Sequence, residues 1–216
     1  DKNWYNRDAF ITNKDVIKLM EEKVPKVYYL PNRRYNYSNT GYCILASIVE
    51  KVSSKSFKKF LEEEVFRPLK MNNSFVYDTT LNKTDSIIYT YGHEKNNRKS
   101  RPSYLNGVVG DKGIYSTVDD MFKFDQALFS GKLLKKEWLE LIFKPMHKDL
   151  YKWDNYGLGW RLNVKDPKDR IAYHTGWWNG YRSYYIKKID KDETIIILNN
   201  TTRGSFLRLE DLLKLI

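Results

Sequence analysis

Two short groups of residues carry side chains suited to proton transfer or hydrogen bonding. In the first, Tyr37, Ser38 and Asn39 stand in a polar, turn-prone stretch immediately before an apolar run. A loop held in this way can present a phenol and a carboxamide to a cleft. Turn residues also gather before helices simply to cap them, so the triplet alone leaves both interpretations open.

The second group is His174, Thr175 and Gly176, which the pattern places at the end of a strand, before a Gly-punctuated turn at residues 177–180. A strand edge followed by glycine can expose a backbone N–H, the kind of donor that stabilises an oxyanion. A histidine in such a turn can equally be an ordinary surface residue. None of the three histidines has a second metal-type ligand at helical or turn spacing, so we expect neither a metal site nor a cofactor.

Helices are expected to position the first group. Apolar residues between 44 and 52 follow the 3.6-residue period, which predicts a buried helix behind the loop that carries Tyr37. An earlier helix begins at Thr12-Asn13-Lys14-Asp15, which resembles a capping box with Asp in place of Glu. Further helices are predicted at residues 57–65, from the caps at 116–117 to 130, and at 136–143.

Strands dominate after about residue 155. They are predicted at residues 157–163, 170–174, 181–189 and 193–199, followed by an amphipathic helix at 205–216. The expected fold class is therefore α+β. A mainly helical subdomain at residues 1–150 would carry Tyr37 and Asn39, and an antiparallel sheet with a C-terminal helix at residues 151–216 would carry His174.

Composition narrows the classes of function. Hydrophobic residues make up 41% of the 216, enough for a core, and no apolar run is long enough to span a membrane. The net charge is +11, but the lysines are scattered singly, so a solvated surface is favoured over nucleic-acid binding. Cys43, the single cysteine, cannot form an internal disulfide and is expected to be buried. Because the first residue is Asp and no leader follows, we expect a processed or excised piece.

Taken together, the two groups resemble motifs of the penicillin-recognising serine hydrolases, which include class C β-lactamases, D,D-carboxypeptidases, D-amino-acid peptidases and related esterases. The family motifs are Ser-x-x-Lys, Tyr-x-Asn and Lys/His-Thr/Ser-Gly, of which the last two match Tyr37-x-Asn39 and His174-Thr175-Gly176. The segments F-R-P-L-K-M-N-N-S-F, G-D-K-G-I-Y-S-T-V-D-D-M-F-K-F and Y-G-L-G-W resemble the family as well. The resemblance covers nearly the whole chain in order and implies a β-lactamase/transpeptidase-like fold.

This resemblance implies a role for each matched residue. Tyr37 would transfer the proton that activates the nucleophile, and Asn39 would hydrogen-bond the substrate amide. His174 would replace the usual lysine in proton transfer or in contacting the substrate carboxylate. Thr175 and Gly176 would line the substrate, and the backbone N–H of Trp177 would form half of the oxyanion hole. Histidine in the lysine position favours peptide or ester substrates over penicillins.

The first family motif is not found where the resemblance requires it. Residues 1–36 contain no Ser-x-x-Lys, and the literal match that begins at Ser56 aligns with a family helix of no catalytic role. We therefore expect that the nucleophile is not in this chain and that the chain alone forms no acyl-enzyme. The protein would be an incomplete serine hydrolase acting on small-molecule or peptide acyl substrates, located outside the cytoplasm of a bacterium, with peripheral association with the envelope.

Two other readings stay open. A non-catalytic family member would bind cell-wall peptide or glycan, for which Trp177, Trp178, Tyr181 and Tyr184 would suit stacking, although alternating aromatics on strands also form cores. A Ser-x-x-Lys in the upstream sequence would favour the enzyme, and its absence would favour the binder. Binding of nucleic acid would instead show an affinity that falls steeply with salt.

An incomplete chain should also self-associate or be only marginally folded, because a missing N-terminal segment would leave an apolar face and a sheet edge uncovered. Light scattering over a concentration series should show the average mass rising with concentration. A constant monomer mass would contradict this expectation.

Overall fold

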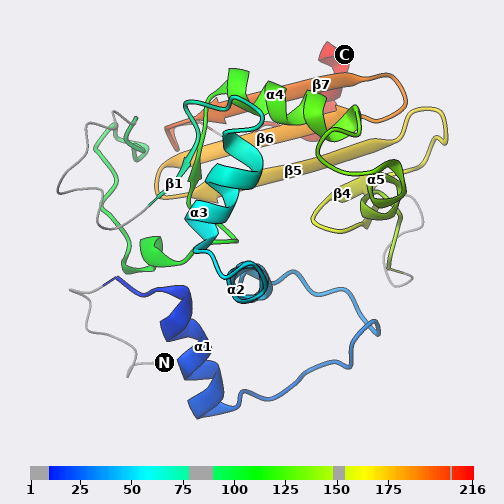
Figure 1. Ribbon diagram of the computed structural model, residues 1–216. Coiled ribbons are helices and arrows are strands. Elements are labelled where there is room, and N and C mark those ends of the chain that lie inside the picture. Colours follow the sequence, from blue (N-terminus) through cyan, green and yellow to red (C-terminus); the bar gives the residue numbers. More distant parts are fainter. Residues whose placement is uncertain (1–9, 78–89, 148–153, 205) are drawn as a thin grey trace. The chain divides into compact units, whose positions relative to one another are not determined.

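A computed structural model describes residues 10–77, 90–147, 154–204 and 206–216. The chain forms two compact units, and each is described by itself (Figure 1). The first comprises Asp1–Tyr28, Tyr37–Thr90 and Arg101–Asp120, and the second Tyr29–Asn36, Tyr91–Ser100 and Met121–Ile216. No helix among the described residues is long and apolar enough to cross a membrane.

The first unit is mainly helical. It contains α1 (Asn13–Lys23), α2 (Asn39–Ser53), α3 (Phe57–Leu61), a π-helical turn (Glu62–Phe66), a 3-10 turn (Tyr104–Gly107), and the short strands β1 (Phe75–Val76) and β2 (Ile114–Tyr115). The predicted capping box is confirmed, since the backbone N–H of Thr12 donates to Asp15 Oδ2 at 2.8 Å. That bond lowers the pKa of the Asp15 carboxyl.

Asn13 joins three segments of the first unit. Its buried amide donates to the carbonyls of Cys43 (3.1 Å) and Val109 (3.0 Å), and its Oδ1 accepts from the Val109 N–H at 2.8 Å. The start of α1 is thereby tied to α2 and to the loop before Gly110. Cys43 is buried as expected, at 1% exposure, and burial raises the pKa of its thiol.

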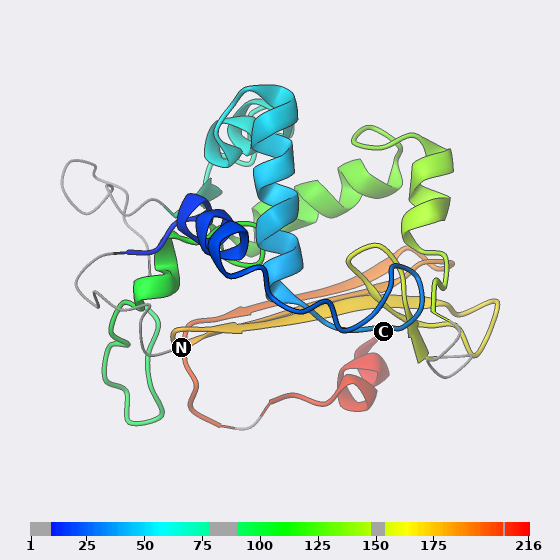
Figure 2. The same ribbon diagram turned by 90° about the horizontal axis from the view of Figure 1, so that it is seen from below.

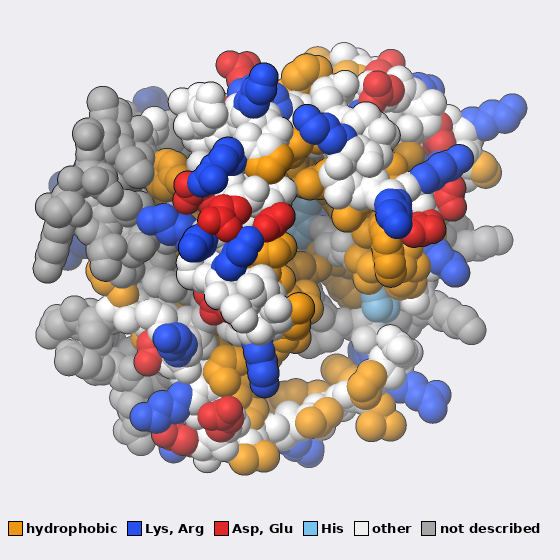
Figure 3. Space-filling view, viewed as in Figure 1, with side chains coloured by type: hydrophobic (Ala, Val, Ile, Leu, Met, Phe, Trp, Pro, Cys, Tyr) orange, Lys and Arg blue, Asp and Glu red, His pale blue; other side chains and the backbone are white. Residues whose placement is uncertain are grey.

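One face of α2 lies at the surface. Leu45, Ile48 and Val52 follow one another at helical spacing and are 52%, 50% and 81% exposed. The segment after α1 is apolar and exposed too, with Val24, Val27 and Tyr28, and Figure 3 shows hydrophobic side chains at the surface there. Part of the apolar surface of this unit is thus turned toward solvent. The prediction of a buried helix is therefore wrong for this face of α2, whose buried residues are Cys43 and Ala46.

The second unit is built on a five-stranded antiparallel sheet in the order β3-β4-β5-β6-β7. The strands are β3 (Asp154–Tyr156), β4 (Arg161–Asn163), β5 (Ile171–Trp178), β6 (Tyr181–Lys188) and β7 (Glu193–Asn199). The helices are α4 (Val118–Phe129), of which the part from Met121 on belongs here, α5 (Lys136–Ile142) and α6 (Leu209–Leu212), followed by a 3-10 turn (Leu213–Leu215). The α+β fold class is confirmed.

Alternation along the strands gives the sheet two apolar faces. Leu162 and Ala172 pack with Leu128 of α4 and Phe143 after α5, whereas Ile186 packs with Leu212 of α6 on the other face. Figure 2 shows α5 and α6 on opposite sides of the sheet.

Three predicted boundaries differ from the structure. Residues 157–160 form a turn between β3 and β4 rather than the start of a strand, and β5 runs on to Trp178, so His174 lies within a strand and not at its end. The final helix is shorter than predicted, since α6 begins at Leu209, and the backbone groups of three described residues before it are bound by strand side chains. Arg182 donates to the carbonyls of Thr202 and Gly204, both at 3.0 Å, and the Leu207 N–H donates to Tyr184 Oη at 3.0 Å.

The two compact units do not divide the chain at residue 150, the boundary expected from the sequence. Helix α5 and most of α4 group with the sheet, because their apolar side chains pack on it. The organisation into domains 1–150 and 151–216 stays a prediction.

A buried ionic network fixes α4 on the sheet. The ammonium of Lys187 donates to Asp125 Oδ2 (3.2 Å), Asp192 Oδ1 (2.5 Å) and Thr194 Oγ1 (3.0 Å), and the hydroxyl of Tyr185 donates to Asp125 as well. Lys187 and Asp125 are fully buried. Burial, together with Asp125, raises the pKa of Tyr185 far above its ordinary value. Removing one partner of such a buried pair typically costs about 3–5 kcal/mol.

The turn between β5 and β6 has the two-residue form that favours Asn-Gly. Asn179 has φ 42° and Gly180 φ 83°, as in a type I′ hairpin turn. A Cβ on Gly180 would lie 2.5 Å from both the His93 nitrogen and Ser100 Oγ. Glycine is therefore required here by its backbone conformation and by its surroundings.

Gly180→Ala and Gly204→Ala should separate these two requirements, since both glycines have φ 83° but no described atom lies within 4 Å of a Cβ at Gly204. In urea unfolding, Gly204→Ala should lose about 1 kcal/mol for its backbone conformation alone. Gly180→Ala should lose about 3 kcal/mol or more, because the overlap adds to that cost. Equal losses would contradict the close approach.

Candidate active site

The predicted second motif lies at the start of α2, in the first unit. Ser38 caps the helix, accepting from the Gly41 N–H at 3.1 Å, and Asn39 is the first helical residue. Tyr37 directly precedes the cap and is 48% exposed. Capping therefore accounts for Ser38, while Tyr37 and Asn39 flank it in the segment that leads into the helix.

The predicted third motif lies within β5, in the second unit. β6 pairs along the whole of β5, placing Tyr185 opposite His174 and Ser183 opposite Gly176. β4 pairs only with Ile171–Tyr173. From His174 onward, β5 therefore runs past the end of β4, on the side where a strand can offer backbone groups to a ligand.

Both ring nitrogens of His174 have partners. Nδ1 lies 2.8 Å from the carbonyl oxygen of Thr175, and Nε2 lies 3.1 Å from the hydroxyl of Tyr156. Burial lowers the pKa of His174, the Thr175 carbonyl opposes this, and nearby Arg161 lowers it further. His174 therefore differs from the cationic lysine whose place the resemblance assigns to it.

Tyr156 is a site residue that sequence reasoning did not single out. It is buried at the end of β3, with its ring 5.1 Å from that of Tyr35, which in turn lies 5.1 Å from the ring of His147. Tyr35 precedes Tyr37 by two positions in the sequence. The available signal was the first letter of the Y-G-L-G-W segment, whose tyrosine is Tyr156.

Gly176 and Trp177 are consecutive residues of β5 and therefore lie on opposite faces of the sheet. A Cβ on Gly176 would overlap Ser183 Oγ on the neighbouring strand, so a larger residue there would require the Ser183 hydroxyl to turn away. Trp177 lies opposite Arg182 and is 63% exposed. Its indole lines a groove of about 650 Å³, together with Arg182, Thr202, Phe206 and residues 94–96.

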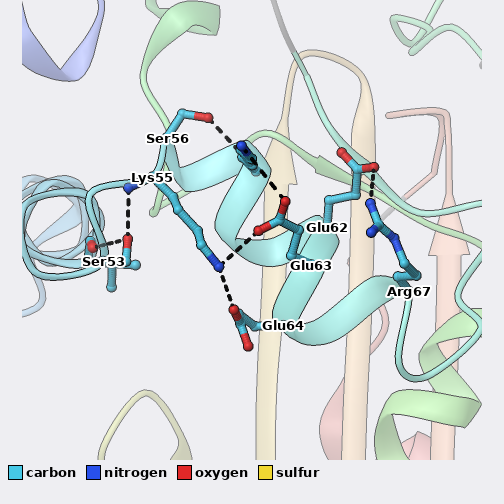
Figure 4. A network of polar contacts seen from close by, with 9 residues as sticks. Ser53, Lys55, Ser56, Glu62, Glu63, Glu64 and Arg67 are labelled. Carbon is cyan, nitrogen blue, oxygen red and sulfur yellow. Dashed lines mark hydrogen bonds and ion pairs between the residues drawn. The ribbon is translucent and has the colours of Figure 1, made fainter.

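Ser56 serves a local role consistent with a coincidental match to Ser-x-x-Lys. Its hydroxyl caps α3 by accepting from the Lys59 N–H at 3.2 Å, and the Lys59 ammonium lies 3.9 Å from Glu63. Figure 4 shows the adjacent Lys55 reaching Glu63 and Glu64, at 2.9 and 2.7 Å.

The structure thus brings Tyr37 and Asn39 together in one unit and gathers His174, Thr175, Gly176 and Trp177 in the other. The catalytic roles of these residues stay predictions. Among the described residues, no group of three or more His, Cys, Asp or Glu side chains is arranged to hold a metal ion.

Because the pKa of His174 is lower in the folded chain than its ordinary value of 6.5, the fold resists protonation of this imidazole. The free energy of unfolding should therefore fall as the pH drops from about 7 to about 5. His174→Gln should show a shallower fall in a series of urea titrations over this range. Parallel curves for the two proteins would contradict the assignment.

Comparison with known proteins extends over nearly the whole chain. Residues 3–215 match the Beta-lactamase family model. Penicillin-binding protein 4* of Bacillus subtilis is 32% identical over 210 residues, which are 92% of this chain and 46% of that protein. The chain thus spans less than half the length of this relative.

Two solved structures share the fold. The octameric penicillin-binding protein homologue from Pyrococcus abyssi aligns with a TM-score of 0.75 at 24% identity, over 93% of this chain and 45% of that one. D-amino acid amidase from Ochrobactrum anthropi aligns with a TM-score of 0.72 at 21% identity, over 97% of this chain and 66% of that one. The resemblance found in the motifs is confirmed: the chain belongs to the beta-lactamase family of penicillin-recognising serine hydrolases.

Proposed function

We propose that this chain is part of a serine hydrolase that cleaves a peptide, amide or ester acyl bond through an acyl-enzyme, with the nucleophilic serine supplied from outside the 216 residues. The observation that carries the proposal is the third motif on β5, where Thr175–Trp177 lies beyond the residues that pair with β4, as a strand that receives an extended substrate would. Tyr37 and Asn39, at the start of α2, are the matching second motif.

Each residue of the two motifs has its own role in the proposed reaction. Tyr37 transfers a proton between the nucleophile and the leaving group, and Asn39 hydrogen-bonds the substrate amide. The backbone N–H of Trp177 donates to the developing oxyanion, a contribution whose removal typically costs about 10²-fold or more in rate. Histidine rather than lysine at position 174 favours peptide, amide or ester substrates over penicillins, and a D-amino acid amidase is among the proteins that share the fold.

We further propose that the protein acts outside the cytoplasm, associates peripherally with the envelope and self-associates. The curated relative quoted above is a bacterial penicillin-binding protein, which supports a site of action outside the cytoplasm, and the net charge of +11 suits peripheral contact with an anionic envelope. The exposed stripe of α2 and the octameric relative support self-association.

A second candidate is a non-catalytic module that binds cell-wall peptide or glycan. The specific observation in its favour is the groove beside the exposed indole of Trp177, since an exposed tryptophan can stack on a sugar or peptide face.

Intact-mass spectrometry after treatment with a fluorophosphonate, and separately with a penicillin, tests the proposal. The 216-residue chain should gain no adduct, whereas a version extended upstream should be labelled at a serine. In the extended protein, Tyr37→Phe should slow labelling about 10²- to 10⁴-fold, the usual contribution of a proton-transfer residue. The exposed Tyr28→Phe is the matched control and should label at the unmodified rate.

An adduct on the 216-residue chain itself would contradict the external nucleophile, and Ser56 and Ser38 would be the first positions to substitute. Absence of labelling in both proteins would favour the binding module.

A further inference from the structure

The donor and acceptor roles around a neutral His174 follow from the chemistry of its two partners. A backbone carbonyl can only accept, so the Nδ1 of His174, 2.8 Å from the Thr175 oxygen, must carry a proton. In a neutral imidazole the other nitrogen is then an acceptor. Tyr156, whose hydroxyl lies 3.1 Å from Nε2, must therefore be the donor.

We propose that Tyr156 is a positioning residue for the third motif, holding His174 as one neutral tautomer with Nδ1–H on the Thr175 carbonyl and Nε2 accepting from the Tyr156 hydroxyl. The burial of the imidazole agrees with its neutral form, as does the positive charge of nearby Arg161.

Tyr156 is itself rigidly held. Asn155, also buried, accepts at Oδ1 from the N–H groups of Tyr156 (2.8 Å) and His147 (3.1 Å), and its amide donates to the His147 carbonyl at 2.6 Å. The Tyr156 ring packs on Tyr35 and stands edge-on to the imidazole, at 84°. The hydroxyl is therefore delivered to Nε2 by a fixed backbone and a packed ring.

The inference changes what His174 does in the reaction, and in this respect it rests on the proposed function. Both nitrogens are engaged within the second unit, so the imidazole neither gives a proton to substrate nor binds its carboxylate while the Tyr156 bond persists. His174 instead fixes the Thr175 carbonyl, and with it the peptide that leads to Gly176 and Trp177. Tyr156 sets the ring plane that makes this possible.

Two measurements on the 216-residue chain test the inference without any turnover. Nitrogen-15 NMR of labelled histidine should show His174, assigned with His174→Gln, as the Nδ1–H tautomer with an Nε2 resonance shifted upfield by an accepted hydrogen bond. In Tyr156→Phe, which keeps the ring, that resonance should move downfield, toward the value of a free acceptor.

Carbethoxylation with diethyl pyrocarbonate, which attacks the unprotonated nitrogen, is the second measurement. His174 should react about five- to tenfold faster in Tyr156→Phe than in the unmodified protein, the factor that one hydrogen bond supplies. The matched control is Tyr173→Phe, on the same strand as His174, which should leave the reaction rate of His174 unchanged. His93 serves as the internal reference, and its rate should be the same in all three proteins.

An Nε2–H tautomer in the unmodified protein would overturn the inference, as would Tyr156→Phe leaving both the resonance and the rate unchanged. The unmodified protein alone decides the tautomer, should Tyr156→Phe fail to fold. Because neither readout needs an active enzyme, failure here is distinct from failure of the labelling experiment.

Discussion

The pairing of β5 with β6 is the constraint on which the second unit depends. Eight residues of each strand are in register across the Asn179–Gly180 turn, and period-two alternation then assigns every side chain to a face. His174 shares a face with Tyr185, and Trp177 shares the opposite face with Arg182. A slip of one residue would exchange these faces and separate His174 from its surroundings. Gly180 in this turn has a positive φ, and a side chain there would overlap the backbone of Gly92 and His93.

The network around Lys187 also restricts the structure, because it joins helix α4 to strand β6. A buried ion pair adds little net stability over an apolar pair, but an unmatched charge in its place is very costly. Asp125 of α4 accepts from Tyr185 and Lys187, two positions apart on β6, so one carboxylate fixes the helix at a single height along the strand. Tyr185, the cross-strand partner of His174, is thus bonded through its hydroxyl to α4.

Much of this architecture could be predicted from the sequence, because it depends on interactions between residues close together in the chain. The Thr12–Asp15 capping box, the helix behind Tyr37, the sheet after residue 155 and the turn after the third motif all depend on neighbours in the chain, and all are present. The motifs also indicated the family. Contacts between distant segments were not predictable. The bond from Tyr156 to His174 links strands that are not neighbours in the sheet, and the bond from the Leu207 N–H to Tyr184 joins the segment before α6 to β6.

Cys43 provides a reporter that the fold itself supplies. It is the only cysteine in the sequence, it is 1% exposed on α2, and its carbonyl is held by Asn13 from the start of α1. A thiol reagent can reach this sulfur only when α2 separates from its packing, so the alkylation rate measures how often that happens. The free energy of opening of the helix that carries Asn39 in its first turn can therefore be measured in the native chain, with no label introduced.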